Sequence, residues 1–267
     1  AVKQLEAQLG VELLTRRGRR VGITPAGTLL LQRGRKLLET ADALVDEVRA
    51  TAAAPSARLR LGITPTARYG IAPRLLAACA VEAPAVMLYT SEDTTGAMLD
   101  AVASGALDLA ITFCATRPPD GIELVPLPGE PAVVHVRADH TLAARTSVGL
   151  DDLADQTILV AGGRDSGGYT DRVLGLFERA GITPTTRTDP YPDLGLQAVR
   201  DGLGVVVYVR SAFPDELAGS TFLPLLPPAD LPFHLAVPRT ASSAAQAVVG
   251  VAKALGSAAD LAFWVDC

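Results

Sequence analysis

The 267-residue sequence predicts an α/β protein in three parts: a small N-terminal head, a long helix, and a larger body of two lobes. Throughout the body, short β-branched runs alternate with stretches of helical periodicity, which is typical of α/β domains with largely parallel strands. Residues 1–60 carry 11 Lys or Arg against 6 Asp or Glu, whereas residues 61–267 carry 13 against 23. A basic head therefore precedes an acidic body, and clustered basic side chains favour contact with a polyanion.

Composition and length exclude several classes of protein. With 49% hydrophobic and 20% charged residues, the chain has the composition of a folded globular protein. No apolar run approaches the roughly 18 residues of a membrane span, and the first residues lack the pattern of a secretory signal, so we expect a cytoplasmic location. The cysteines Cys79, Cys114 and Cys267 are odd in number and widely spaced. This spacing indicates reduced thiols rather than disulfides or a zinc site.

Residues 1–24 predict a short helix followed by a tight hairpin. Val2, Leu5 and Leu9 recur at helical spacing, and the arginine-rich segment 16–20 separates two apolar flanks. The first residue already lies inside the helix, so we expect the head to be the C-terminal part of a larger module. The arginines suit contacts with phosphates or with a narrow minor groove, although a solvated basic turn has the same composition.

A long helix is expected over residues 25–54, because Thr24 followed by Pro25 is a favourable helix start. Leucines and small residues alternate from position 27 to position 48 with heptad spacing, over about 33 Å of helix. This pattern favours a homodimeric helix pair, with a helix packed on its own domain as the alternative. The candidate dimerisation residues are Leu30, Gly34, Leu37, Ala41, Leu44 and Val48. The segment 51–56 then breaks the helix.

The body, residues 58–255, carries the alternating strands and helices, and residues 256–267 form a tail. The expected strands are Leu59–Ile63, Val86–Tyr89, Leu107–Thr112, Val133–Val136, Ile158–Val160, Thr185–Thr188, Val205–Val209 and His234–Val237. The expected helices are Pro73–Ala83, Thr95–Ser104, Tyr169–Ala180, Leu194–Asp201 and Ser243–Leu255. Proline-rich stretches divide the body into a first lobe, about residues 58–115 with 240–255, and a second lobe, about 116–239.

Candidate ligand contacts follow the expected strands, where ligands of such sheets bind. Thr64 and Thr66 follow the first strand, and Thr94 and Thr95 follow the second and open a helix. Hydroxyls and free backbone N–H groups at helix starts suit a carboxylate or a similar anion. The alternative is that these residues serve only as caps and turns.

Three apparent catalytic or metal signals are weak. Asp165-Ser166-Gly167-Gly168 resembles the serine segment of trypsin-like proteases, but those folds are all-β and require a paired histidine. The glycine-rich loop at residues 162–168 lacks the patterns of nucleotide-binding loops, and the histidines show no metal-ligand spacing. We therefore expect neither an enzyme nor a metal or cofactor.

The sequence resembles the LysR-type transcriptional regulators. Residues 3–14, 16–21 and 23–27 resemble the end of that family's winged helix-turn-helix. Residues 60–63, 73–76 and 105–111 resemble its first effector lobe. Residues 137–143, 177–184 and 199–205 resemble its second lobe, so the resemblance covers nearly residues 1–255.

The resemblance implies a partial winged helix-turn-helix, a linker helix and a two-lobed effector domain of the periplasmic-binding-protein type. It implies a regulator that binds double-stranded operator DNA as a homodimer or homotetramer and responds to a small anionic effector between the lobes. The expected DNA contacts are Lys3, Gln4, Arg16, Arg17, Arg19, Arg20 and Thr24. The expected effector contacts are Thr64, Thr66, Thr94, Thr95, Gly167 and Tyr169.

Two departures from the family pattern affect these expectations. The family's recognition helix begins several residues before Ala1, so this chain alone is expected to bind DNA weakly. Val209-Arg210 stands where the family often has a proline, at one wall of the cleft. The alternative function is a stand-alone solute-binding protein with the same two-lobed fold, which would use neither the arginines nor the heptad helix.

Overall fold

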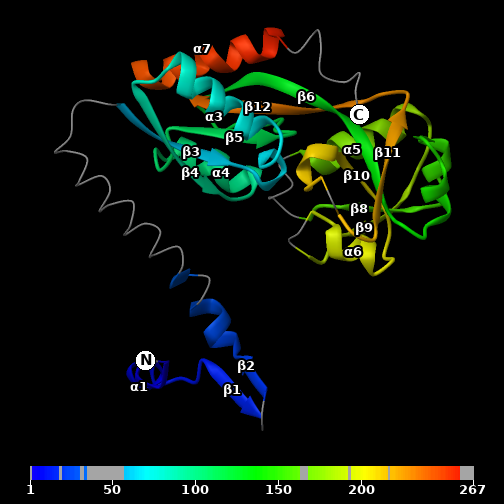
Figure 1. The fold of residues 1–267 in the computed structure, drawn as a ribbon, viewed down its shortest axis with the longest axis horizontal. Coiled ribbons are helices and arrows are strands. Elements are labelled where there is room, and N and C mark those ends of the chain that lie inside the picture. Colours follow the sequence, from blue (N-terminus) through cyan, green and yellow to red (C-terminus); the bar gives the residue numbers. More distant parts are fainter. Residues whose placement is uncertain are drawn as a thin grey trace. The chain divides into compact units, whose positions relative to one another are not determined.

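The fold is given by a computed structural model that describes residues 2–17, 20–30, 33–34, 57–162, 168–191, 194–215 and 217–258. The chain divides into two compact units, Ala1–Pro55 and Ser56–Cys267. Figure 1 shows the helices and strands of both units. Every helix in the described part of the chain is too short or too polar to span a bilayer.

The N-terminal unit contains the predicted helix and hairpin. Helix α1 (Val2–Leu9) precedes the antiparallel strands β1 (Leu14–Arg17) and β2 (Arg20–Ile23). The carboxylate of Glu6 ties helix to hairpin, because its Oε1 accepts the backbone N–H groups of Leu13 at 2.8 Å and Leu14 at 3.0 Å. A second helix covers residues 25–30 and 33–34 of the described chain.

The first lobe of the body is a sheet with helices on both faces. Its parallel strands are β3 (Ala57–Ile63), β4 (Val86–Glu92) and β5 (Leu109–Phe113). Helices α3 (Ile71–Glu82) and α7 (Ser243–Ala258) share the larger hydrophobic core, and α4 (Thr95–Ala103) packs in a smaller one on the other face (Figure 1). Glycine at position 62 permits the close approach of α4, since a Cβ there would lie 2.2 Å from the sulfur of Met98.

Two strands join the lobes, β6 (Ile122–Arg137) and β12 (Asp230–Pro238). The first half of β6 pairs antiparallel with β12, which also pairs with β5 of the first lobe. The second half of β6 pairs with strands of the second lobe. Residues 122–131 and 230–238 thus pair in one sheet with β5 of the first lobe, and the expected bounds of the two lobes stay a prediction.

The second lobe surrounds the distal half of β6 (Figure 1). Its strands are β7 (Val148–Gly149), β8 (Thr157–Val160), β9 (Thr185–Thr188), β10 (Val206–Val209) and β11 (Ser220–Leu226). Its helices are α5 (Tyr169–Arg179) and α6 (Leu196–Arg200), with short 3-10 turns η2 (Thr141–Ala144), η3 (Asp151–Leu153) and η5 (Arg210–Ala212). Strand β8 pairs with β9, and β10 and β11 both pair with β6.

The α/β class and each strand and helix expected in the body are confirmed, with shifted ends. The expectation of largely parallel strands is wrong for β6, β10, β11 and β12. β12 runs antiparallel to β5 and β6, and β10 and β11 run antiparallel to β6. Hydrophobic periodicity identifies a buried strand but carries no information about its direction.

Candidate functional site

A hydroxyl pair joins the two lobes. Thr66 lies in the turn η1 (Pro65–Ala67) after β3, and its Oγ1 is 3.0 Å from the hydroxyl of Tyr208 on β10. Both side chains are buried, although 142 positions separate them in the sequence. A polar group buried without a partner is costly, so this hydrogen bond favours the arrangement of the lobes seen here.

Aromatic rings fill the space beside this hydroxyl pair. The ring of Phe113, at the end of β5, has its centroid 5.2 Å from that of Tyr208, 5.9 Å from that of Tyr169 and 5.0 Å from that of Phe233. The centroids of Tyr169 and Tyr208 are 4.8 Å apart. Residues from both lobes and from a joining strand thus form one aromatic cluster, which we call the interlobe cluster.

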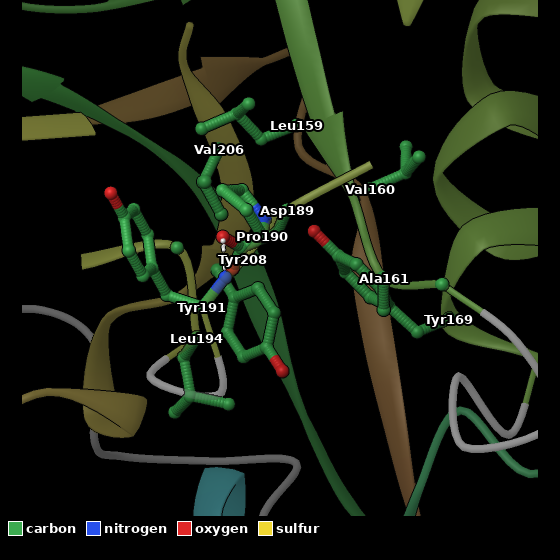
Figure 2. A pocket seen from close by; sticks show the side chains of 12 residues that line it. Leu159, Val160, Ala161, Tyr169, Asp189, Pro190, Tyr191, Leu194, Val206 and Tyr208 are labelled. Atoms are coloured by element: carbon green, nitrogen blue, oxygen red, sulfur yellow. Dashed lines mark hydrogen bonds between the residues drawn. The ribbon is translucent and has the colours of Figure 1, made fainter. Parts of the chain in front are cut away.

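A cavity of about 390 Å³ opens against the two tyrosines of this cluster (Figure 2). Its volume lies in the range of small-molecule sites, about 300–1,000 Å³. The walls come from β8, from the segment after β9, from the start of α6 and from β10. The lining residues are Leu159, Val160, Ala161, Gly162, Tyr169, Asp189, Pro190, Tyr191, Leu194, Gly195, Val206 and Tyr208.

The phenols of Tyr169 and Tyr208 stay protonated at neutral pH. The hydroxyl of Tyr169 donates to the carbonyl of Val207 at 2.8 Å, and that of Tyr208 pairs with Thr66. Burial is the largest cause that raises the pKa of both tyrosines above the ordinary value, and the negative charge of Asp189 is the smallest. These tyrosines therefore supply neutral surface to the cavity rather than an acid or base.

Asp189 is held by the backbone around it. Its N–H donates to the carbonyl of Val160 at 2.9 Å, and its Oδ1 accepts the N–H of Tyr191 at 3.0 Å. The first bond ties the end of β9 to the end of β8, and the second fixes the turn through Pro190 (Figure 2). The carboxylate thus has a fixed place in the cavity wall.

A second polar contact lies where β6 passes from the first lobe to the second. Glu130 is 6% exposed, and its Oε1 accepts a hydrogen bond of 2.6 Å from the hydroxyl of Ser211 on η5. Burial raises the pKa of Glu130, although the bond from Ser211 acts in the opposite direction. A Cβ at position 70 would lie 2.6 Å from Oε1 and 2.4 Å from the Ser211 oxygen, so glycine there permits this contact.

Most of the side chains expected to contact an effector form hydrogen bonds within the protein itself. Thr94 caps α4 by accepting the N–H of Ala97, and the hydroxyl of Thr95 bonds the backbone of Phe113. Thr64 is 1% exposed, and its hydroxyl has no hydrogen-bond partner among the described residues. The ring of Tyr169 lines the cavity, whereas Gly167 lies outside the described residues. Their role as effector contacts stays a prediction.

The expected DNA contacts lie on two elements of the N-terminal unit. Lys3 and Gln4 are exposed on α1, and Arg16, Arg17 and Arg20 belong to the hairpin strands β1 and β2. Thr24 caps the following helix, since its Oγ1 accepts the N–H of Gly27 at 2.9 Å and donates to Glu12 O at 2.7 Å. Arg19 lies outside the described residues.

Two of the expected dimerisation residues fall in the described chain, where Leu30 and Gly34 are both half-buried. The others lie outside the described residues: Leu37, Ala41, Leu44 and Val48. Their part in an oligomer stays a prediction.

Sequence reasoning missed Asp189 and Tyr208 as site residues. Asp189 directly follows the parallel strand β9, so the rule that ligands bind beyond the carboxyl ends of strands could have found it. Tyr208 lies inside a strand that reads only as apolar core. No signal in the sequence places it opposite Thr66, because that contact depends on how the lobes are joined.

Removing the hydroxyl pair between the lobes is expected to destabilise the body. Thr66→Val and Tyr208→Phe should each lower the free energy of unfolding by about 1–2 kcal/mol, since each leaves a buried hydroxyl unpaired. In the double variant the loss in free energy of unfolding should be about 1 kcal/mol smaller than the two single losses added together, because both hydroxyls are absent and neither is left buried without a partner. Urea unfolding measures all three. Tyr191→Phe is the control, since its hydroxyl bonds the exposed Asp201; additive losses would contradict the coupling.

Two α/β lobes joined by two crossing strands, with a cavity at the second lobe's strand ends, define a ligand-binding body of the periplasmic-binding-protein type. The family described as LysR substrate binding domain matches residues 52–256. A probable hydrogen peroxide-inducible genes activator of Mycobacterium avium is 32% identical over 219 residues, which are 81% of this chain and 69% of that protein.

The regulator BenM of Acinetobacter baylyi is 28% identical over 240 residues, which are 88% of this chain and 78% of BenM. The crystal structure of full-length BenM matches with a TM-score of 0.64 and 26% identity, covering 96% of this chain and 86% of BenM. CbnR, a LysR family regulator, has a TM-score of 0.70 at 22% identity and covers 96% of this chain and 87% of its own, which shows a shared fold. The chain belongs to the LysR-type family of transcriptional regulators. These relatives support a regulator rather than a stand-alone solute-binding protein.

Proposed function

We propose that this chain regulates transcription in the cytoplasm by binding double-stranded promoter DNA through its basic head, and that a small molecule in the cavity changes this binding. It acts as a homodimer or homotetramer and not as an enzyme. The observation that carries the proposal is the cavity beside the interlobe cluster, in a chain of this family. A ligand there touches elements that meet between the lobes, so it can shift the population of their arrangements.

The cavity adjoins the contacts that hold the lobes together. Tyr208 both lines the cavity and bonds Thr66 of the first lobe, and the cavity-lining ring of Tyr169 stacks on Phe113. A ligand that moves either ring must disturb a contact between the lobes. Differential affinity for two lobe arrangements is the condition for an effector to change DNA binding.

The two cysteines in the described part of the chain do not support a peroxide response of the kind for which the Mycobacterium avium relative is named. Cys79 and Cys114 are both buried. Burial raises the pKa of the Cys79 thiol, and it raises that of Cys114 to about 12. The thiolate is the reactive form, so these protonated thiols are expected to be inert. A ligand in the cavity therefore fits this chain better as the signal.

Replacing Arg16 and Arg17 with glutamine is expected to weaken DNA binding and its dependence on salt. Each arginine that contacts a phosphate should contribute about 0.9 to the slope of log affinity against log salt, so the double variant should lose about twice that value. Fluorescence anisotropy with a labelled duplex, from about 50 to about 200 mM salt, measures the affinity and the slope.

A double variant of the body, Arg179→Gln with Arg187→Gln, removes the same charge and is the matched control. Both of these arginines are exposed on the second lobe. An equal loss of affinity and slope in the two double variants would mean that net charge, and not the hairpin, determines DNA binding.

A further inference from the structure

Aliphatic side chains of two neighbouring strands form one face of the cavity. Ile158 of β8 bridges Val205 of β10 in parallel, so the residues that follow them, Leu159 and Val206, lie side by side on the same face. Both side chains are buried and line the cavity (Figure 2). A ligand that places apolar surface against them removes that surface from water, which is favourable.

Other segments add apolar surface to the same cavity. The rings of Tyr169 and Tyr208 and the side chain of Leu194 line it (Figure 2). The φ of Leu194 is +62°, in the left-handed region that a bulky side chain rarely adopts. Strain of this kind persists where the surrounding structure determines it, and Leu194 packs against the large core of the body. The cavity therefore has apolar surface from β8, β10, α5 and the segment before α6.

Val206 fills the space beside the start of α6. A Cβ at Gly195, the residue before that helix, would lie 2.5 Å from Cγ2 of Val206, and both residues line the cavity. Removing the methyl groups of Val206 would therefore extend the cavity toward α6. Val207, the next residue of β10, is also buried, but its side chain points to the opposite face of the strand.

We propose that the effector carries an apolar body, an aromatic ring or a short alkyl chain, that packs against Leu159 and Val206, and that Val206 limits the length of this body. The inference rests on the proposed function, in which the cavity holds the effector. A cavity of about 150 Å³ already holds benzene, so one of about 390 Å³ accepts a ring with a short alkyl substituent. The anionic group expected from the sequence concerns another part of the ligand and stays a prediction.

Benzyl alcohols with a para-alkyl chain that grows from methyl to hexyl test the inference by isothermal titration calorimetry with the full chain. These probes keep one head group and lengthen only the apolar body. Affinity should rise about fourfold with each added methylene group until the body fills the cavity, and then stop rising. The ring of myo-inositol has a similar size but is covered with hydroxyl groups, so it should bind more weakly than benzyl alcohol. No rise with alkyl length, no binding of any alcohol at millimolar concentration, or tighter binding of myo-inositol would overturn the inference.

Two matched variants assign the length limit to its residue. Val206→Ala removes two methyl groups from the cavity wall, so affinity should go on rising for about one or two further carbon atoms of the alkyl chain. Val207→Ala deletes the same atoms on the other face of β10 and should leave the limit unchanged. A limit that is unchanged in Val206→Ala, or shifted equally in both variants, would overturn the role of Val206. The titrations of the natural chain test the apolar body even if a variant does not fold. Because they contain no DNA, their failure is distinct from a failure of the arginine variants to alter DNA binding.

Discussion

Replacing Phe233 with alanine is expected to lower the free energy of unfolding of the body by about 3–5 kcal/mol. Phe233 is fully buried on β12, where it pairs with Phe113 of β5 and Leu127 of β6. Its ring supports that of Phe113, which contacts the cavity-lining rings of Tyr169 and Tyr208. The substitution opens a cavity at the point where the lobes are joined, and the surrounding sheet can collapse only partly to fill it.

The same substitution should also loosen the cavity wall, because Phe113, which contacts Tyr169 and Tyr208, loses the ring that supports it. Urea unfolding of the natural chain and of the variant measures the loss of stability. Phe233→Leu is the control: it keeps an apolar side chain and should cost about 1.5 kcal/mol or less if the site repacks. If Phe233→Ala lowered the free energy of unfolding by less than about 1.5 kcal/mol, the interlobe cluster would add little to stability.

The sequence predicts most elements of the body because their patterns are local. The apolar positions of α5, Val173, Leu176 and Phe177, recur at helical spacing, and all three are buried. Strand β5 is apolar apart from Thr112, and all its residues are buried. Patterns of this kind depend only on which face of an element is covered.

Strands that contain proline were missed for a physical reason. The first half of β6 contains Pro126, Pro128 and Pro131, and β11 contains Pro224. Proline lacks the N–H that a strand ladder uses, so each of these segments resembles a loop in sequence. Tertiary pairing overrides the local preference: Pro126 lies opposite His234, and Pro131 lies opposite Asp230.

The contacts of the candidate site are harder to predict than the fold, because they join residues that are distant in the sequence. The bond between Thr66 and Tyr208 joins a turn of the first lobe to a strand of the second. The threonines were expected to bind a ligand because of their positions after strands, and the structure pairs two of them inward. Which hydroxyl faces a ligand depends on how the two lobes are positioned against each other. Hydrophobic periodicity and motif spacing do not encode that arrangement.

Mild acid is expected to destabilise the body through a single buried histidine. His135 lies on the distal half of β6, fully buried, with its ring stacked on Phe222 at a centroid distance of 4.7 Å. Its Nε2 is 2.9 Å from the hydroxyl of Ser220, and its Nδ1 has no hydrogen-bond partner in the described part of the chain. Burial, together with the positive charges of Arg200 and Arg210, lowers the pKa of His135 from 6.5 to about 4.

The sign of the effect follows from proton binding. As the pH falls below 6.5, the unfolded chain takes up a proton at His135 that the folded chain does not accept until about pH 4. The unfolded state is thereby favoured, and this residue alone should lower the free energy of unfolding by about 2 kcal/mol between about pH 7 and about pH 5. Below the folded pKa both states are protonated, and the loss reaches a constant value.

Urea unfolding at several pH values between these limits measures the loss. His135→Gln removes the titrating group, so its stability should depend on pH by about 2 kcal/mol less than that of the natural chain over the same interval. Ser220→Ala is the matched variant, because it removes the partner of Nε2 and leaves the histidine buried. Ser220→Ala should lower the free energy of unfolding at every pH and leave its dependence on pH unchanged. Equal slopes in His135→Gln and the natural chain would assign the acid sensitivity to other groups, since only a residue that titrates differently in the two states can change the slope.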